Sequence, residues 1–448
     1  MRTTAQLLVG AVALIGPAVA RVPVYVMLPL DTVTNDLTIK DANNLKNNLN
    51  QLKSGGVEGV MCDCWWGLVE QEEKKYEFDV YKDLAQMVAD AGLKMEFVMS
   101  FHSCGGNTGD DCDIPLPQWA LNSGSDLWYV DQSGNQDKEY MSLFADDEAI
   151  VGSTGRTPIE VYGDYMTEFT SAMSSFMGNV IVEVEVGCGP AGELRYPSYQ
   201  LDKWAFCGVG EFQSYSSLAV NQLQAAATAA GHEEWASSGG PSNAGDYNSV
   251  PADTDFFTTG KENNYESDYG QFYLDWYSSS LINHGAKVMN VASQAFSGSG
   301  VELSVKVSGV HWWYGHDSHA AELTAGYWNI PGANDVYGDI SSMLAKVNAS
   351  FDFTCLEMQD SEQPAECECE PYELVQQTKQ SAIDKNIGYR GENALQRYDQ
   401  TAYNTMKSQS SSLNHRIGGL TYLRLTDELL SDSNWNTFTQ FVSDMSYL

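Results

Sequence analysis

Polar and aromatic side chains that suit carbohydrate chemistry follow several short apolar runs of this chain. Carboxyl groups can bind sugar hydroxyls or transfer protons, and tryptophan rings can stack on sugar rings. In chain order these side chains are Asp63, Trp65, Trp66, His102, Glu183, Glu185, Glu193, His311, Trp312, Trp313, Thr354, Glu357, Glu392, Asn393 and Arg424. A single carboxylate of this kind is more often a salt-bridge partner, so the prediction of a sugar site depends on their gathering at one place.

Eight apolar runs rich in β-branched residues carry these side chains, and helical patterns separate the runs. Several runs are apolar at consecutive positions, which is typical of strands buried on both faces of a parallel sheet. The runs are 22–28, 56–66, 93–102, 180–187, 301–313, 350–358, 386–395 and 418–425. Eight strands alternating with helices predict an α/β fold, a single (β/α)8 TIM barrel, whose active site would form at the carboxyl ends of the strands.

The helical patterns are regular. Leucines 45, 49 and 52 are spaced for one helix face, and Thr157 and Glu160 form a capping box that opens a helix with Tyr162 and Phe176 on its buried face. Further helices are expected at 80–91, 212–230, 272–296, 336–347, 371–383 and 435–445.

Two connections are much longer than the others. They span residues from about 103–156 and 188–300. Long connections after barrel strands lie over the carboxyl-end face. We therefore expect them to form a lobe of βα loops over that face, within one catalytic barrel of residues 21–448.

The charge balance excludes some partners. The 448 residues carry 24 basic and 60 acidic side chains, a formal net charge of −36. The negative electrostatic field would repel nucleic acid and anionic lipid surfaces, whereas a neutral sugar is unaffected by it. Plain solubility is the more common reason for such a charge.

Residues 1–20 have a short basic start, an apolar stretch and a small-x-small end, which is the pattern of a signal peptide. They predict a secreted, extracellular protein or one in a secretory-pathway compartment.

The nine cysteines are an odd number, so at least one thiol has no partner within the chain. They lack zinc-ligand spacing, and we expect neither a metal ion nor a cofactor. Cys355 is predicted to be a free thiol whose modification inhibits the protein, with Cys104 as the next candidate. A buried, inert Cys355 is the alternative.

Two longer motifs are specific. Residues 189–199 read GPAGELRYPSY and residues 102–110 read HSCGGNTGD. They resemble the two signatures of the β-amylase family. The resemblance runs from Val22 to about Val442 and includes MCDCWWG at 61–67, VSGVHWWY at 307–314, FTCLEM at 353–358 and GENAL at 391–395.

This resemblance implies an exo-acting, inverting hydrolase of α-1,4-glucosidic bonds that releases β-maltose from the non-reducing ends of starch-type glucans. The protein would bind an α-1,4-glucan, either starch or maltooligosaccharides. It would do so as a monomer. By motif, Glu193 would be the general acid and Glu392 the general base. An inverting pair needs a separation of ~6.5–9.5 Å to admit water. The fourth and seventh strands, nearly opposite in a barrel, suit that gap.

The same motifs imply the substrate-binding residues Asp63, His102, Asp110, Lys306, His311, Thr354, Asn393, Ala394, Leu395 and Arg424. Asp63, His102 and Asp110 would hold the two terminal glucose units under a mobile lid of residues 105–112. The leaving-group side would be bound by Lys306 and His311. The remaining positions would lie near the base, with Leu395 wedged between sugars. Three residues depart from the family pattern: Thr108, Gln359 and Gln396.

Some alternatives stay open. Glu183 and Glu185 alternate with valines on one predicted strand, so they could point into the barrel and pair with Lys306 or with arginines. A glucan-binding protein without turnover would be expected to lose the acid, the base or the lid, all of which are present. A glycosidase of the same fold acting on another sugar is the second alternative, and the product formed from starch would separate the three.

Overall fold

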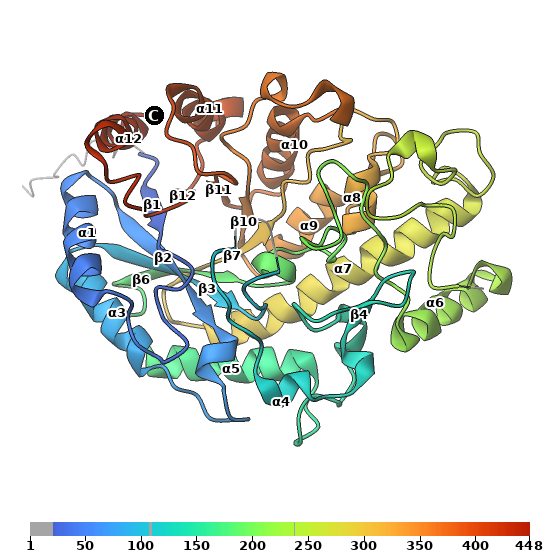
Figure 1. Ribbon diagram of the computed structural model, residues 1–448, viewed down its shortest axis with the longest axis horizontal. Coiled ribbons are helices and arrows are strands. Elements are labelled where there is room, and N and C mark those ends of the chain that lie inside the picture. Colours follow the sequence, from blue (N-terminus) through green and yellow to red (C-terminus); the bar gives the residue numbers. More distant parts are fainter. Residues whose placement is uncertain (1–20, 107–109, 237) are drawn as a thin grey trace, which may run out of the picture.

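Eight parallel strands close into a barrel in the computed structural model, which describes residues 21–106, 110–236 and 238–448 (Figure 1). Around the wall the order is β1-β2-β3-β6-β7-β10-β11-β12, so barrel neighbours follow one another along the chain. The strands are β1 (Val24–Met27), β2 (Gly59–Trp65), β3 (Lys94–Ser100), β6 (Ile181–Val186), β7 (Glu302–Val307), β10 (Ser350–Phe353), β11 (Tyr389–Glu392) and β12 (Leu420–Tyr422). The predicted barrel and its eight strands are confirmed. Each strand is shorter than its apolar run because the run continues into the following loop and, for most strands, also begins in the loop before it.

Helices surround the barrel (Figure 1). They are α1 (Ala42–Ser54), α2 (Trp66–Val69), α3 (Asp79–Asp90), α4 (Gln118–Leu121), α5 (Pro158–Ala172), α6 (Ser217–Ala230), α7 (Asp268–Ala295), α8 (Ala320–Ala325), α9 (Val336–Ala345), α10 (Pro371–Asp384), α11 (Gln400–Ser411) and α12 (Asp432–Met445). The capping box opens α5 as predicted, with Thr157 Oγ1 accepting from the Glu160 N–H at 3.1 Å. Since α5 ends at Ala172, Phe176 lies beyond the helix to which it was assigned.

The first long connection holds short elements that the apolar pattern did not predict, whereas the second holds the two helices expected at 212–230 and 272–296. The first contains α4 and the hairpin of β4 (Tyr129–Val130) and β5 (Gln136–Asp137); the second contains α6 and leads into α7. A second small hairpin, β8 (Asn329–Ile330) and β9 (Asn334–Asp335), follows α8. In Figure 1, α6 lies beyond α7, away from the strands.

Strand residues alternate between the barrel interior and the helices. On β10, for example, Phe351 and Phe353 pack in the large core between strands and helices, while Asp352 faces its barrel neighbours inside. A small apolar cluster of Met27, Met61 and Val98 is separate from that core. Within the described part of the chain, no helix combines the length and apolar character that crossing a membrane requires. The predicted signal peptide, residues 1–20, lies outside the described residues.

Candidate active site

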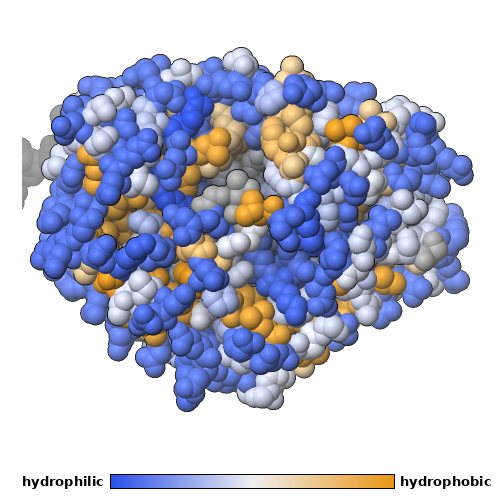
Figure 2. Space-filling model, viewed as in Figure 1, coloured by the Kyte–Doolittle hydropathy of each residue, from blue (hydrophilic) through white to orange (hydrophobic). Residues whose placement is uncertain are grey.

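A cavity of about 770 Å³ opens at the carboxyl ends of the barrel strands. Viewed as in Figure 1, the molecule is hollowed near its centre, and hydrophobic residues stand around the hollow (Figure 2). Every residue that the family motifs assign to the site lines this cavity: Asp63, His102, Asp110, Glu193, Lys306, His311, Thr354, Glu392, Asn393, Ala394, Leu395 and Arg424. Of the other candidates, Trp65 and Trp312 line it as well, whereas Trp66, Glu183, Glu185, Trp313 and Glu357 do not. The barrel therefore gathers side chains that are as much as 361 positions apart in sequence, from Asp63 to Arg424.

Glu193 follows β6 and comes directly after the short turn Pro190–Gly192. Arg195 Nε donates to Glu193 Oε2 at 2.6 Å, and the Arg195 side chain is buried. The guanidinium also lies over the Tyr199 ring, 4.1 Å from its centroid. A buried arginine thus fixes the orientation of this carboxyl group. We did not predict a role for Arg195; its only sequence signal is its place two residues after Glu193 in the same motif.

Glu392 is the last residue of β11 and is buried. Lys306 Nζ lies 3.2 Å from Glu392 Oε2 and 3.1 Å from Glu185 Oε1. Burial raises the pKa of Glu392 to about 8; Lys306 acts to lower it, and the charges of Glu185 and Glu193 add to the rise. Lys306 is therefore the cation that favours the charged form of Glu392.

The two glutamates reach the cavity from separated strands. Between β6 and β11 in the barrel wall lie β7 and β10. Carboxyl groups that approach a sugar from different directions leave room for water between base and substrate. The arrangement can therefore support an acid and a base on opposite faces of one bond.

Asp63 and His102 line another part of the cavity. Ser100 Oγ donates to Asp63 Oδ1 at 2.7 Å; burial raises the pKa of Asp63, and this hydrogen bond opposes the rise. Burial lowers the pKa of His102 to about 3, with Lys306 and Arg195 contributing, so the imidazole is neutral and can donate and accept. The His102 ring packs edge-on against Trp65, whose Nε1 donates to the Leu30 carbonyl at 2.9 Å.

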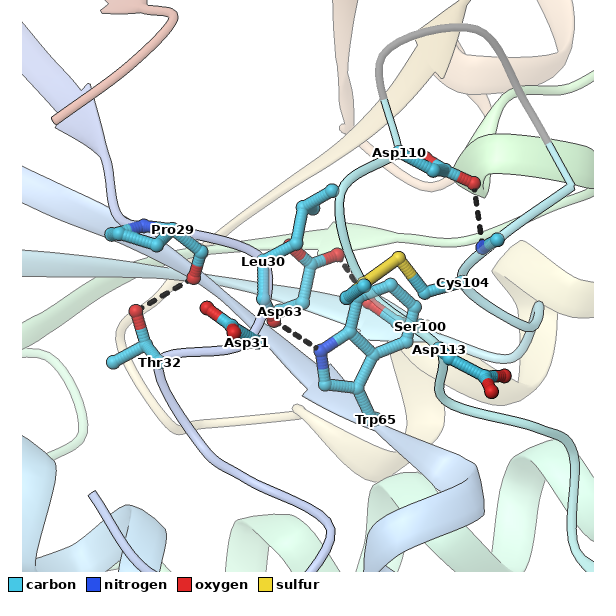
Figure 3. The surroundings of a disulfide bond; sticks show 12 residues. Pro29, Leu30, Asp31, Thr32, Asp63, Trp65, Ser100, Cys104, Asp110 and Asp113 are labelled. Carbon is cyan, nitrogen blue, oxygen red and sulfur yellow. Dashed lines mark hydrogen bonds between the residues drawn. A yellow bond between two sulfur atoms is a disulfide. The ribbon is translucent and has the colours of Figure 1, made fainter. Parts of the chain in front are cut away.

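A disulfide between Cys104 and Cys112 spans the predicted lid (Figure 3). Asp110 Oδ2 accepts from the Gly105 N–H at 2.8 Å within this segment. The expectation of Cys104 as a reactive thiol is wrong because its sulfur is bonded to Cys112. Thr108 lies outside the described residues, and movement of this segment stays a prediction.

An aromatic arm, defined here as residues 199–207, borders the cavity beside His311. Tyr199, Trp204 and Phe206 line the cavity, and the Phe206 ring lies 6.0 Å from that of His311. Burial lowers the pKa of His311 to about 4. A second disulfide, between Cys207 and Cys367, ties the arm to the loop after β10. Sequence reasoning missed the arm, although its aromatic residues directly follow the GELRYPSY motif.

Side-chain hydrogen bonds fix the loop after β11 in place. Asn393 Nδ2 donates to the carbonyls of Leu395 and Leu423 at 2.8 and 3.0 Å, and its Oδ1 accepts from the Leu423 N–H at 2.8 Å. Because these bonds occupy its amide, Asn393 can meet a ligand chiefly through its backbone. Glu357 accepts from the N–H groups of Ala394 and Leu395 at 3.1 and 2.8 Å. Leu395 is thereby presented to the cavity with half of its surface exposed.

Thr354 lies at the rim of the cavity. Thr354 Oγ1 accepts from the Gly309 N–H at 2.8 Å, which joins the loops after β10 and β7. Five cysteines have free thiols, and all five are buried: Cys62, Cys64, Cys188, Cys355 and Cys369.

Among the described residues, one trio of side chains has ligand atoms close enough to share a metal ion, namely Glu185, Asp352 and Glu392. Lys306 already contacts two of the three.

Comparison with known proteins decides the family. Residues 25–447 match the sequence family described as glycosyl hydrolase family 14. The chain belongs to glycosyl hydrolase family 14. It is 48% identical to a β-amylase of Vigna unguiculata, over 95% of this chain and 87% of that protein, and 45% identical to β-amylase 1, chloroplastic, of Arabidopsis thaliana, over 95% and 75%. The solved catalytic domain of a β-amylase from Paenibacillus polymyxa is similar, with a TM-score of 0.80 and 28% identity, over 96% of this chain and all of that one.

Two departures from the β-amylase pattern can be placed in this family member. Gln359 Nε2 donates to Thr405 Oγ1 of α11 at 2.9 Å, so it fastens the loop after β10 to that helix. Gln396 lines the cavity and accepts from the Tyr398 hydroxyl at 3.3 Å. Neither change touches Glu193 or Glu392, so the proposed acid and base are left intact.

Proposed function

We propose that this family 14 member is an exo-acting, inverting hydrolase that cleaves α-1,4-glucosidic bonds of starch-type glucans and releases β-maltose from non-reducing ends. The observation that carries the proposal is the pair of carboxyl groups in one cavity, Glu193 held by Arg195 and Glu392 held by Lys306. The relatives named above are β-amylases.

In the proposed reaction, Glu193 in its acid form gives a proton to the departing glycosidic oxygen. Glu392 as a carboxylate takes a proton from the water that attacks the anomeric carbon from the opposite face. The bond to the leaving chain breaks as the bond to water forms, so the α linkage yields a β product. Glu193 then needs a proton from solvent, and Glu392 returns one, before the next turnover.

The other cavity residues would position the substrate. Asp63, His102 and Asp110 would hold hydroxyls of the terminal glucose units, and neutral His102 suits that role because it can both donate and accept. His311 and the aromatic arm would hold the leaving chain. Tryptophan and phenylalanine rings fit the apolar faces of pyranose rings, which agrees with their gathering on that side.

Incubation with soluble starch tests the proposal. NMR of the earliest product should show β-maltose, and the viscosity should fall slowly because internal bonds stay intact. Early α-maltose, or a collapse of viscosity before sugar appears, would contradict it. A glucan-binding protein would release no sugar, and a glycosidase of another specificity would leave starch unchanged.

Secretion is a further proposal, supported by the disulfides. Cys104–Cys112 and Cys207–Cys367 are the kind of bonds that persist in oxidising compartments. Sequencing the N-terminus of the mature protein recovered from the source would test cleavage near residue 20. A monomer in solution also stays a prediction, for light scattering to test.

A further inference from the structure

Asp352 is a completely buried carboxyl group that the proposed reaction does not use. In the strand register it lies between Lys306 of β7 and Arg390 of β11. Neither of its side-chain oxygens has a hydrogen-bond partner among the described residues. Buried polar atoms are nearly always hydrogen-bonded, so these two oxygens require an explanation.

Asp352 belongs to a cluster of three acidic groups. Oxygen atoms of Asp352, Glu185 and Glu392 all lie within 4.8 Å of one another. Glu185 and Glu392 share the ammonium group of Lys306, at 3.1 and 3.2 Å. If all three carboxyl groups were ionised, three negative charges would face that one positive charge away from water. In a buried cluster of carboxyl groups with too few cations, one carboxyl group keeps its proton.

The surrounding charges indicate which member keeps it. Arg390 is engaged elsewhere, by Glu96 and by Glu183 at 2.6 Å. The other charged groups that face the cluster are acidic: Glu183 of β6, Asp63 of β2 and Glu193 of the loop after β6. Glu185 and Glu392 each have the Lys306 ion pair, whereas Asp352 has no ion pair with any residue that the structure describes. Burial, together with the charges of Glu392 and Glu185, raises the pKa of Asp352 well above its ordinary value.

We propose that Asp352 is a positioning residue for the base: it carries a proton and donates it in a hydrogen bond to the Glu185–Glu392 pair. Glu392 Oε1 and Glu185 Oε2 lack hydrogen-bond partners among the described residues, so acceptors are available. A neutral donor favours the charged form of the carboxyl that accepts from it. Asp352 thereby extends the activity of Glu392 to lower pH. The proposal rests on Glu392 as the base of the proposed function.

Two substitutions compared by pH profile test the inference, with maltoheptaose as substrate. Asp352→Asn keeps a donor at the same place, so the acid limb of kcat/KM should stay where the parent has it. Asp352→Leu fills the space without a donor, so that limb should move to higher pH by about one unit, with little change in KM. Ser350→Ala is the matched control, since Ser350 lies on the same strand and donates to Glu302, away from the base. Its acid limb should not move.

An ionised Asp352 would shift the acid limb of kcat/KM in the opposite direction. If Asp352 were ionised, both variants would remove a repelling charge from Glu392, and both acid limbs would move to lower pH. That result, or no movement in either variant, would overturn the proposal. A metal ion bound by the trio would also overturn it, and would show as a change in parent activity on chelation or calcium addition that Asp352→Asn lacks.

Infrared difference spectroscopy gives a readout that does not depend on turnover. The parent should show the carbonyl band of a buried neutral carboxylic acid that Asp352→Asn lacks. This holds even if Asp352→Leu does not fold. If the band is present but starch is not hydrolysed, the proposed function fails while the protonation of Asp352 stands. If starch is hydrolysed and the band is absent, the inference about Asp352 fails alone.

Discussion

The interior of the barrel has two sides of different character. Toward the cavity, the side built by β1, β2 and β3 is apolar, with Met27, Met61 and Val98 as its cluster. The side built by β6, β7, β10 and β11 is charged, and it holds Glu183, Glu185, Lys306, Asp352, Arg390 and Glu392. Asp63 at the rim of β2 and Glu96, which reaches across to Arg390, are the exceptions on the apolar side.

This difference separates two tasks. The apolar side offers a sugar ring a dry contact surface and excludes water, which strengthens electrostatic interactions nearby. On the charged side, carboxyl groups share the cations Lys306 and Arg390, and their ionisation would set when Glu392, the proposed base, is active. Changes on the charged side should therefore alter rate and pH dependence, whereas changes on the apolar side should alter stability.

The largest expected effect is on the charged side. Glu193→Gln and Glu392→Gln should each lower kcat by at least about 10²–10⁴-fold, because a general acid or base contributes that much. Glutamine keeps the shape of the side chain, so maltose binding, measured by calorimetry, should remain. A loss of only a few-fold from either change would place the proton transfer on another residue.

On the apolar side, Met61→Ala should lower the free energy of unfolding by about 2–5 kcal/mol, because it removes a buried side chain and leaves space behind it. Met61→Leu nearly conserves volume and should cost less than about 1.5 kcal/mol. Denaturant unfolding measures both. Neither variant removes a titrating group, so the limbs of the pH–rate profile should not move. A shift of the acid limb in Met61→Ala would show that the two sides are coupled.

The sequence predicts the barrel and the cavity residues well because both depend on local patterns. Consecutive apolar residues mark the strands, and the motifs place Glu193 after one strand and Glu392 at the end of another. The rest depends on contacts between distant segments. Asp352 alternates with Phe351 and Phe353, which marks it as facing inward, but nothing in that pattern shows that its neighbours are Glu185 and Glu392. Cys207 and Cys367 are 160 residues apart, and cysteine positions alone do not determine pairing.

Glu357 lies at the rim, behind the loop that carries Leu395. Burial raises its pKa to about 7, above the ordinary value, even though two backbone N–H groups donate to it. A carboxyl with a raised folded-state pKa favours folding below its unfolded pKa, and that contribution is lost as pH rises through about 7.

Glu357→Gln cannot take up that proton, so its melting temperature should fall less than the parent's between about pH 5 and pH 8. Because an amide oxygen accepts more weakly from the two N–H groups, KM for maltoheptaose should rise by a few-fold, equivalent to about 1 kcal/mol. Melting curves across the pH range and steady-state kinetics check both parts. Parallel melting curves would mean that Glu357 does not titrate in this range.

The smallest expected effect is slow inhibition by bulky thiol reagents acting through Cys355, on the rim of the charged side. Its thiol is buried and lies against Gly309, where an added Cβ would stand 2.6 Å from the sulfur. Burial, with the charges of Glu357, Asp360 and Glu193, raises the pKa of the thiol well above its ordinary value. The thiolate is the reactive form, so inactivation should be slow and should accelerate as pH rises.

Once modified, Cys355 would press on Gly309 and so disturb the bond between Gly309 and Thr354 at the cavity rim. Substrate should therefore protect the enzyme, and Cys355→Ser should keep its activity while resisting the reagent. Cys188→Ser is the matched control, since Cys188 is an equally buried free thiol, and the atoms that an added Cβ at Gly309 would meet belong to Cys355 and Thr354 rather than to Cys188. It should be inactivated at the parent's rate. If Cys355→Ser is inactivated as fast as the parent, the sensitive sulfur is one of the other free thiols, because Cys104 is bonded to Cys112.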